Sequence, residues 1–366
     1  MNGNSPLLLI GIGTAGCAVA SGVNRAFGEG LRYVLMDTDA SAGEFGGTFT
    51  LLGGDRLSGR GAGGDVVTGR LAAEESIKVL DEHLEGVRIA VIVTALGGGT
   101  GGGATLEAAK HLSERGIPTV VFATLPFAFE GEDRKRNACG VQTMIEDAAS
   151  ATFFIPLDKL IGETDNMDEA MRRAVDTLAG GVTLFWRLVE KPGYIRLDTE
   201  RLRHLLTGAG RGRFATVTVQ GPGRAAEAVD KLLRSELLTA AAGPVRATLC
   251  GVLAGNDLLL SEVGKVADGV RGAFGGLTFD LATVNDDQTF SGRLSVVVML
   301  FEANTRADES PSPCAAATGG RHRKPRGPLT TGPNGRGRFK NAEPTIWNGE
   351  DLDIPTFIRK NINLDF

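Results

Sequence analysis

Two glycine clusters are the segments of this chain whose composition and spacing could bind a ligand through the backbone. The first, Gly11-Ile12-Gly13-Thr14-Ala15-Gly16, follows the apolar run Leu7–Ile10 and opens a predicted helix. Asp37 lies about 20 residues beyond it, so the segment fits the dinucleotide-binding fingerprint. The same geometry lets backbone amides face the phosphates of a nucleoside triphosphate. The first cluster therefore predicts phosphate binding, and leaves a nicotinamide enzyme or a simple tight turn as alternatives.

The second cluster, Gly97-Gly98-Gly99-Thr100-Gly101-Gly102-Gly103, narrows those alternatives. It follows Leu96 and precedes a helix that we expect to begin near Ala104. Ordering so many glycines costs backbone entropy. A plain turn needs one or two of them, whereas amides that wrap a polyphosphate need the side chains removed. A nicotinamide enzyme has no use for this second cradle, and the chain lacks the GxxxxGK[ST] segment of a P-loop.

The elements that must position these clusters alternate between apolar runs and helical patterns, which is typical of a parallel α/β sheet. In the N-terminal part we expect strands at Leu7–Ile10, Tyr33–Met36, Val87–Ala95 and Thr119–Ala123. Helices are expected from Cys17 and over Leu106–Arg115. A long helix is expected over about Asp168–Glu190, and Pro192-Gly193 ends it.

A second group of elements predicts a smaller α+β domain. Its expected strands are Thr216–Val219, Ala247–Ala254, Thr278–Val284 and Leu294–Phe301. Its expected helices are Ala225–Leu238 and Ser261–Phe274. Serine, proline, glycine and basic residues follow and have the composition of a disordered tether. The predicted divisions are a nucleotide-binding domain (1–167), a central helix (168–190), a connecting segment (191–213), the α+β domain (214–302), a disordered linker (303–345) and a terminal peptide (346–366).

Composition excludes several classes of protein. The 366 residues carry a net charge of −5 without an excess of basic residues, which argues against a nucleic-acid partner. No run approaches the roughly 18 apolar residues that a membrane span needs. The four cysteines and four histidines show no ligand spacing, so no metal site is predicted. A cytoplasmic protein is expected.

The second cluster resembles the glycine signature of the tubulin/FtsZ superfamily, with Gly102 where that family usually has threonine. Further segments resemble its nucleotide loops in order: Asp37-Thr38-Asp39-Ala40, Gly61-Ala62-Gly63-Gly64, Pro126–Gly131 with Arg134, and Ile155–Leu160. The resemblance covers nearly the whole chain. It implies a Rossmann-like GTP-binding domain and subunits that polymerise head to tail into filaments for bacterial cell division.

The resemblance also implies which residues hold GTP or GDP. Glu130 and Arg134 match positions at the ribose and phosphates, and Asp176 matches the aspartate that distinguishes guanine from adenine. Met171 stands where the family stacks an aromatic ring, so base affinity is expected to be weaker. Mg²⁺ is expected to offset the phosphate charge. The remaining nucleotide-binding candidates are Gly13, Thr14, Ala15, Gly16, Asp37, Gly63, Gly64, Gly97, Gly98, Gly99, Thr100, Gly101 and Gly102.

The largest departure from the family lies in Arg196-Leu197-Asp198-Thr199-Glu200-Arg201, where the family carries Asn-x-Asp-x-x-Asp on the loop that completes a neighbouring subunit's site. Only Asp198 is retained. A guanidinium donates hydrogen bonds and accepts none, so Arg201 cannot position an attacking water as a carboxylate does. Three readings stay open: hydrolysis is slow or absent, Glu200 replaces the missing acceptor, or Arg201 contacts the γ-phosphate as an arginine finger.

The end of the chain resembles the family's tail peptide. Asp353, Ile354, Pro355, Phe357 and Ile358 are the predicted partner-binding residues, with apolar side chains at helical spacing. The resemblance implies a membrane-adaptor protein of the FtsA or ZipA type as partner, and hence a place at the division site. A terminal helix that folds back on its own domain is the alternative.

Overall fold

The computed structural model describes residues 5–28, 30–160, 166–239 and 243–303, together with 346–347 and 350–351. The chain forms two compact units, Met1–Asp308 and Glu309–Phe366. In the second unit the described residues form two short antiparallel strands, β11 (Ile346–Trp347) and β12 (Glu350–Asp351). The predicted linker after residue 303 and the partner-binding residues 353–358 lie outside the described residues.

A ten-stranded sheet with the order β3-β2-β1-β4-β5-β6-β7-β10-β8-β9 runs through the first unit. Its first six strands are parallel, as the alternating pattern of the sequence predicts. These strands are β1 (Leu7–Ile12), β2 (Tyr33–Asp37), β3 (Thr48–Leu51), β4 (Ile89–Ala95), β5 (Thr119–Leu125) and β6 (Ala151–Pro156).

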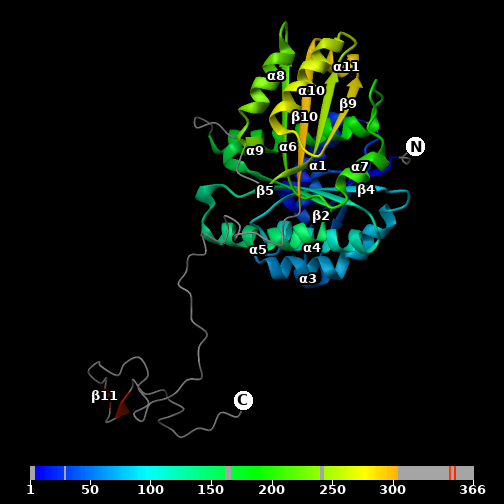
Figure 1. The fold of residues 1–366 in the computed structure, drawn as a ribbon. Helices are drawn as coiled ribbons and strands as arrows, with labels where there is room; N and C mark the ends of the chain where they lie inside the picture. The colour runs from blue at the N-terminus through cyan, green and yellow to red at the C-terminus, as the bar shows by residue number, and fades with distance from the viewer. Residues whose placement is uncertain are drawn as a thin grey trace. The chain divides into compact units, whose positions relative to one another are not determined.

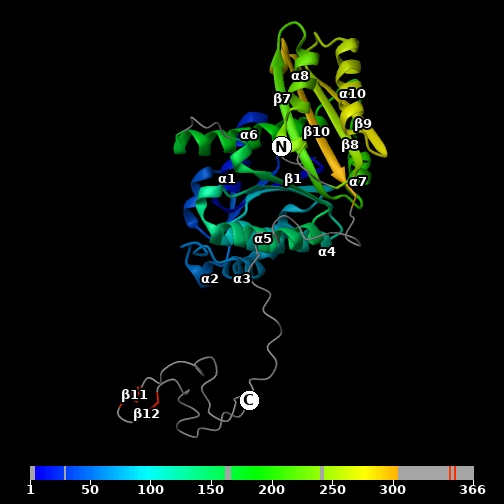
Figure 2. The ribbon, with the colours of Figure 1, turned by 60° about the vertical axis from the view of Figure 1, so that its left-hand side comes forward.

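Helices cover both faces of this parallel part (Figure 1). On one face lie α1 (Gly13–Phe27) and the central helix α6 (Met167–Glu190). On the other lie α3 (Val66–Ser76), α4 (Gly99–Glu114) and α5 (Glu132–Ala148), with α2 (Gly54–Leu57) beside α3 in Figure 2. Short 3₁₀ turns complete this part at Ala40–Phe45, Ile77–His83, Ala128–Glu130 and Leu157–Lys159.

The smaller C-terminal part is α+β, as predicted, and its strands continue the same sheet. Strand β7 (Gly210–Gln220) pairs in parallel with β6 through its first residues and antiparallel with β10 (Arg293–Glu302) along its length. β8 (Val245–Ala254) and β9 (Thr278–Asn285) complete the order. The helices are α7 (Thr199–Leu206), α8 (Arg224–Leu233), α9 (Glu236–Thr239), α10 (Leu260–Phe274) and α11 (Asp287–Phe290). The prediction of a single helix over Ala225–Leu238 is therefore wrong, because this segment forms two helices, and the second begins at Glu236.

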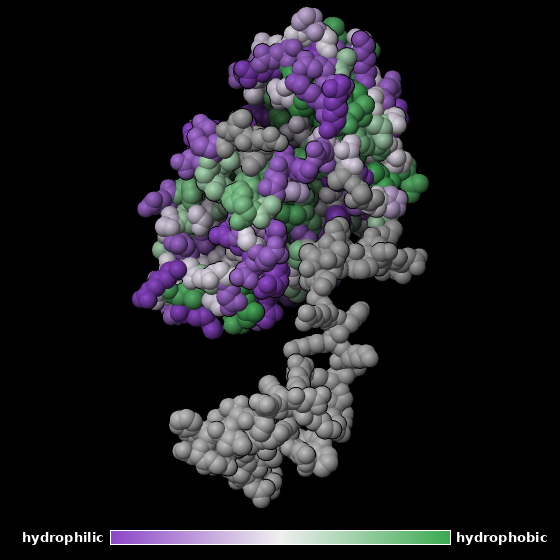
Figure 3. All heavy atoms as spheres, turned by 90° about the vertical axis from the view of Figure 1, so that its left-hand side faces the viewer, coloured by the Kyte–Doolittle hydropathy of each residue, from purple (hydrophilic) through white to green (hydrophobic). Residues whose placement is uncertain are grey.

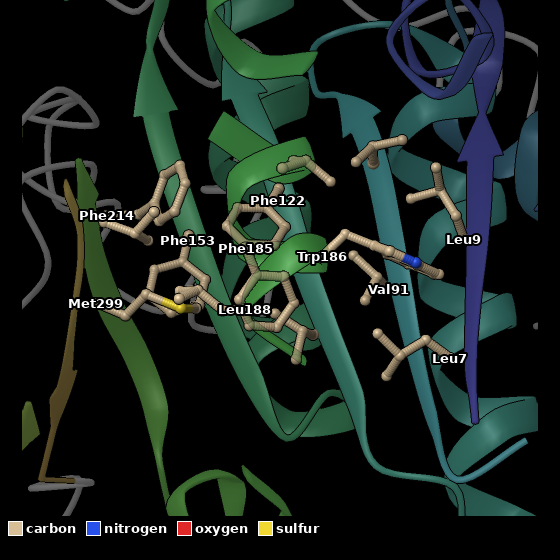
Figure 4. Close-up of a cluster of buried hydrophobic side chains, with 14 of the residues drawn as sticks. Leu7, Leu9, Val91, Phe122, Phe153, Phe185, Trp186, Leu188, Phe214 and Met299 are labelled. Atoms are coloured by element: carbon tan, nitrogen blue, oxygen red, sulfur yellow. The ribbon is translucent and has the colours of Figure 1, made fainter. Parts of the chain in front are cut away.

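The largest core lies between the sheet and α6. Phe185 and Trp186 of α6 are fully buried, and Figure 4 shows them between Leu9 of β1 and the aromatic side chains of the neighbouring strands. The rings of Phe122 and Phe153 stack with centroids 5.1 Å apart. This core also includes strand residues of the C-terminal part such as Met299. The central helix therefore packs against both parts of the unit through one apolar surface.

The surface in Figure 3 carries hydrophilic side chains interspersed with separate apolar patches. Within the described parts of the chain, no helix is both long enough and apolar enough to cross a bilayer.

Candidate nucleotide-binding site

The two glycine clusters meet at the carboxyl ends of β1 and β4, which are adjacent and parallel. From β1 the sheet continues through β2 in one direction, and from β4 through β5 in the other. Open α/β sheets bind ligands at such a switch point, because the loops diverge there. Helix α1 starts after β1 on one face and α4 after β4 on the other. Their N-termini are close together: a Cβ added to Gly13 would lie 3.4 Å from the amide nitrogen of Gly101.

The second cluster is mostly helix and not loop. Helix α4 begins at Gly99, five residues earlier than the expected start at Ala104, and α1 begins at Gly13 rather than at Cys17. A Cβ on Gly101 would lie 2.0 Å from the carbonyl oxygen of Ala95, and one on Gly103 would lie 2.4 Å from that of Val66. Several glycines are therefore required for close packing of α4 on β4 and α3. The expectation that nearly every side chain is absent to make room for phosphate is therefore wrong for Gly101 and Gly103, which are needed for packing.

Gly97 and Gly98 form the turn itself. Gly97 has a φ of +109°, which favours glycine, while Gly98 caps α4 in an extended conformation and has open space where a side chain would be. The first amides of α1 and α4 have no partner within their helices. Two helix N-termini side by side, with an open approach at Gly98, fit a polyphosphate.

Hydroxyl groups connect the loops around this point. Thr38, after β2, and Thr100, in the first turn of α4, share a hydrogen bond of 2.6 Å between their hydroxyl oxygens. The hydroxyl of Thr94 lies 3.1 Å from the carbonyl oxygen of Ile12 and 3.2 Å from that of Gly101. These contacts hold the two helix N-termini at a fixed separation, and none of them is apparent from the sequence pattern.

Asp37 faces into the protein. Its side chain is 2% exposed and accepts hydrogen bonds from the Thr14 hydroxyl (2.8 Å) and the Thr38 amide (2.7 Å). Burial raises the pKa of the Asp37 carboxyl, and these hydrogen bonds only partly offset that effect. The ribose-binding acid of the dinucleotide fingerprint must face the ligand, so this geometry counts against the nicotinamide alternative. Asp37 instead fixes the turn that contains Thr14.

The loop that contains Gly63 and Gly64 lies beside the N-terminus of α4. A Cβ on Gly99 would lie 2.5 Å from the carbonyl oxygen of Asp65, the residue that caps α3. Gly63 and Gly64 are exposed and both have positive φ, which lets the loop turn sharply. Asn137 of α5 donates from Nδ2 to the carbonyl oxygens of Gly64 (2.9 Å) and Gly97 (3.2 Å). The sequence carries no signal for this contact, because it joins three distant segments.

Glu130 and Arg134 lie after β5 and form an ion pair of 2.6 Å. The other carboxylate oxygen of Glu130 accepts from the Phe127 amide at 2.8 Å, while the Arg134 side chain is largely exposed. Asp158 accepts from the Ala128 amide, so the segments after β5 and β6 are tied together.

Met171 and Asp176 are exposed on the first half of α6, a helix that packs beside α1. Gly22 of α1 contacts Ala179 of α6, one turn after Asp176. A shallow hollow of about 470 Å³ surrounds Asp176 and is lined by Glu169, Arg172, Arg173, Asp176 and Thr177. Asp176 therefore has access to a ligand from solvent.

The predicted catalytic residues lie at the opposite end of the sheet. Asp198 caps α7 and accepts from the Arg201 amide at 2.7 Å, and Glu200 pairs with Arg88, which immediately precedes β4. The glycine cluster follows the other end of this strand. Seven residues that rise about 3.3 Å each place the two ends roughly 20 Å apart. Asp198, Glu200 and Arg201 therefore do not meet the glycine clusters of their own chain.

Arg201 and Glu200 both have partners within the chain. The guanidinium of Arg201 donates to both carboxylate oxygens of Asp280 on β9, from Nε at 2.6 Å and from Nη2 at 2.8 Å. This hydrogen-bonded carboxylate raises the pKa of Arg201 still further. Glu200 lies 3.4 Å from Arg88 and 3.9 Å from Arg203. Asp280 and Arg88 could not be assigned from the sequence, because they lie far from this loop in the chain.

The fold defines an α/β protein in which two helix N-termini lie side by side at the switch point of the sheet, an arrangement that suits a phosphate-bearing ligand. Residues 6–165 match the family model described as the Tubulin/FtsZ family, GTPase domain. The cell division protein FtsZ of Pseudomonas putida is 33% identical over 269 residues, which cover 72% of this chain and 68% of that protein. The FtsZ of Pseudomonas aeruginosa is 32% identical over 266 residues, with 71% and 68% covered.

The solved structures agree with this result. An empty FtsZ dimer from M. jannaschii superposes with a TM-score of 0.76 at 26% identity, over 82% of this chain and 89% of that one. This chain belongs to the tubulin/FtsZ family.

Proposed function

We propose that this protein binds GTP and GDP and polymerises head to tail into filaments that act in bacterial cell division. Relatives that are named cell division protein FtsZ, and a solved relative described as a dimer, support this function. On this proposal the protein acts in the cytoplasm, at the division site.

The observation that carries the proposal is the separation of the two halves of the site. The glycine clusters lie at the carboxyl ends of the parallel strands, and Asp198, Glu200 and Arg201 lie at the amino ends. On this proposal, a complete site would require a second copy whose amino-end face meets the glycine clusters of the first. Repetition of such a heterologous contact gives a filament and not a closed dimer.

We assign roles to the candidate residues on this basis. The amides at Gly13–Gly16 and Gly97–Gly102 would bind the phosphates, and Gly63 and Gly64 would approach them from the α3 side. Glu130 and Arg134 would contact the ribose and phosphates, while Asp176 and Met171 would contact the guanine. Mg²⁺ would be held mainly by phosphate oxygens, because Asp37, the nearest buried carboxylate, is already occupied by Thr14 and Thr38. The GTP-binding domain would comprise 1–167 and the α+β domain 214–302, joined by the helix 168–190 and the segment 191–213.

Hydrolysis would be completed across the subunit interface, and its rate depends on residues 198–201. The second candidate is a GTP-binding structural filament or division regulator with little or no hydrolysis. The bidentate contact between Arg201 and Asp280 favours this second candidate. It holds a guanidinium, which only donates hydrogen bonds, at the position where the family has a water-positioning acid.

The terminal peptide 346–366 is proposed to bind a membrane adaptor of the FtsA or ZipA type, through Asp353, Ile354, Pro355, Phe357 and Ile358. The segment 303–345 would act as its disordered tether and would raise the local concentration of peptides along a filament.

The test is phosphate release from GTP with Mg²⁺ over a range of protein concentrations, with light scattering on the same samples. Turnover that rises together with scattering above a threshold concentration supports a site built between subunits. Scattering without turnover supports the structural filament. The absence of both, in samples that also fail to bind GDP, would overturn the proposal.

A further inference from the structure

We propose that Asn137 is a positioning residue that sets the preference of this site for a nucleoside triphosphate over the diphosphate. The inference rests on the proposed binding of GTP and adds a residue that neither the sequence motifs nor the family resemblance assigns. It starts from the contact in which Asn137 joins the loop at Gly64 to the turn at Gly97.

The geometry of this contact fixes the orientation of the amide. Two carbonyl oxygens lie within 3.2 Å of the same atom of Asn137, and only the amide nitrogen can donate to both. Asn137 is partly buried on α5, and the same helix packs closely on Gly97, where an added Cβ would lie 3.3 Å from the Cβ of Arg134. The contact therefore connects two loops to one rigid helix.

The loop at Gly61–Gly64 needs such a connection. Gly61, Gly63 and Gly64 all have positive φ, and nothing lies within 4 Å of the side-chain positions of Gly63 and Gly64. Exposed glycines have many accessible conformations, so ordering them around a ligand costs entropy. The backbone contact between the Gly61 amide and the Thr38 carbonyl holds one end of the loop, and Asn137 holds the other.

The position of this loop predicts which phosphate it serves. The candidate guanine contact, Asp176, lies on α6, which covers the same face of the sheet as α1. The loop at Gly63 and Gly64 leads into α3 on the opposite face, beyond the N-terminus of α4. A nucleotide that starts at α6 and crosses the two helix N-termini reaches this loop with its last phosphate. GDP ends before it, so fixing the loop in advance favours the triphosphate alone.

The test compares affinities for GDP and for guanosine 5′-O-(3-thiotriphosphate) by isothermal titration with Mg²⁺, at protein concentrations below the onset of light scattering. The variants are Asn137→Ala, which removes both hydrogen bonds, and Asn137→Gln, which retains the amide donor. Arg136→Ala is the matched control, because the neighbouring side chain is 71% exposed and its ion pair is local, with Asp133 on the same helix.

We expect Asn137→Ala to bind the triphosphate analogue about tenfold more weakly, as the loss of two hydrogen bonds of ordinary strength implies. Its affinity for GDP should match the wild type, which also shows that the variant is folded. Asn137→Gln should recover part of the loss, and Arg136→Ala should resemble the wild type. Equal weakening of both nucleotides, or no change in either, would overturn the role of Asn137. A wild-type protein that binds neither nucleotide would instead refute the proposed function itself, and the inference with it.

Discussion

Replacement of Arg201 by aspartate should restore a hydrogen-bond acceptor to the loop that completes the neighbouring site, but the structure shows that this single change is confounded. Arg201 makes two charge-assisted hydrogen bonds to Asp280, and an aspartate at position 201 would face that carboxylate. The variant that isolates the catalytic effect is therefore Arg201→Asp with Asp280→Asn.

The magnitudes follow from exposure and charge. The Arg201 side chain is 48% exposed, so solvent screening limits the pair to about 1 kcal/mol of stability. Two carboxylates about 5 Å apart in a water-like dielectric add about 1 kcal/mol of repulsion. Arg201→Asp alone should thus lose about 2 kcal/mol and melt several degrees lower. The double variant should recover about half of that loss.

Catalysis should change in the opposite direction. A positioned acceptor contributes on the order of 10² to 10⁴ in rate, so even imperfect restoration should raise phosphate release at least about tenfold. The assay is phosphate release from GTP with Mg²⁺ at several protein concentrations, with light scattering and thermal melting on the same preparations.

Asp280→Asn alone is the control, because it frees Arg201 without adding an acceptor. If that variant hydrolyses GTP faster, then Arg201 acts as a cation on the phosphates and our reasoning about the missing acceptor is wrong. A double variant that assembles and melts normally yet releases phosphate at the wild-type rate would refute it as well.

Three further predictions test other parts of the structure. Gly101→Ala should lower the free energy of unfolding by at least about 2 kcal/mol in thermal melts, because the added Cβ would overlap the backbone. Gly98→Ala should melt like the wild type and change only the affinity for GDP. Equal melting temperatures for the two variants would contradict the packing argument. Asp37→Asn should raise the free energy of unfolding at pH 7 but not near pH 3. The raised pKa of the Asp37 carboxyl means that the folded state loses stability as the pH rises above about 4, and asparagine avoids that loss. Urea titrations at both pH values measure the effect, and a gain in stability that persists at low pH would contradict it. Arg187→Met should lower the free energy of unfolding by about 3 kcal/mol, because Asp286 loses the guanidinium that lies 3.1 Å away. Asp286→Asn in the same background should restore part of that stability. An Arg187→Met variant as stable as the wild type would show that the pair adds no net stability.

The sequence alone determined much of this protein. Alternating apolar and helical patterns predicted the parallel sheet, and the two glycine clusters predicted a phosphate site, because each cluster follows an apolar run and opens a helix. The departure at Arg201 was also visible without a structure, since a guanidinium cannot accept a hydrogen bond. The sequence could predict these features because they depend on local composition and residue chemistry.

The tertiary structure decided what depends on distant partners. It showed that Gly101 and Gly103 serve close helix packing, which no count of glycines can reveal. It brought Asp280 to Arg201 and Asn137 to Gly64 and Gly97 from segments far apart in the chain. It also placed residues 198–201 at the end of the sheet opposite the glycine clusters, because the direction of a strand fixes which end each loop occupies. Such relations arise from strand order and register, which a periodic pattern in the sequence does not encode.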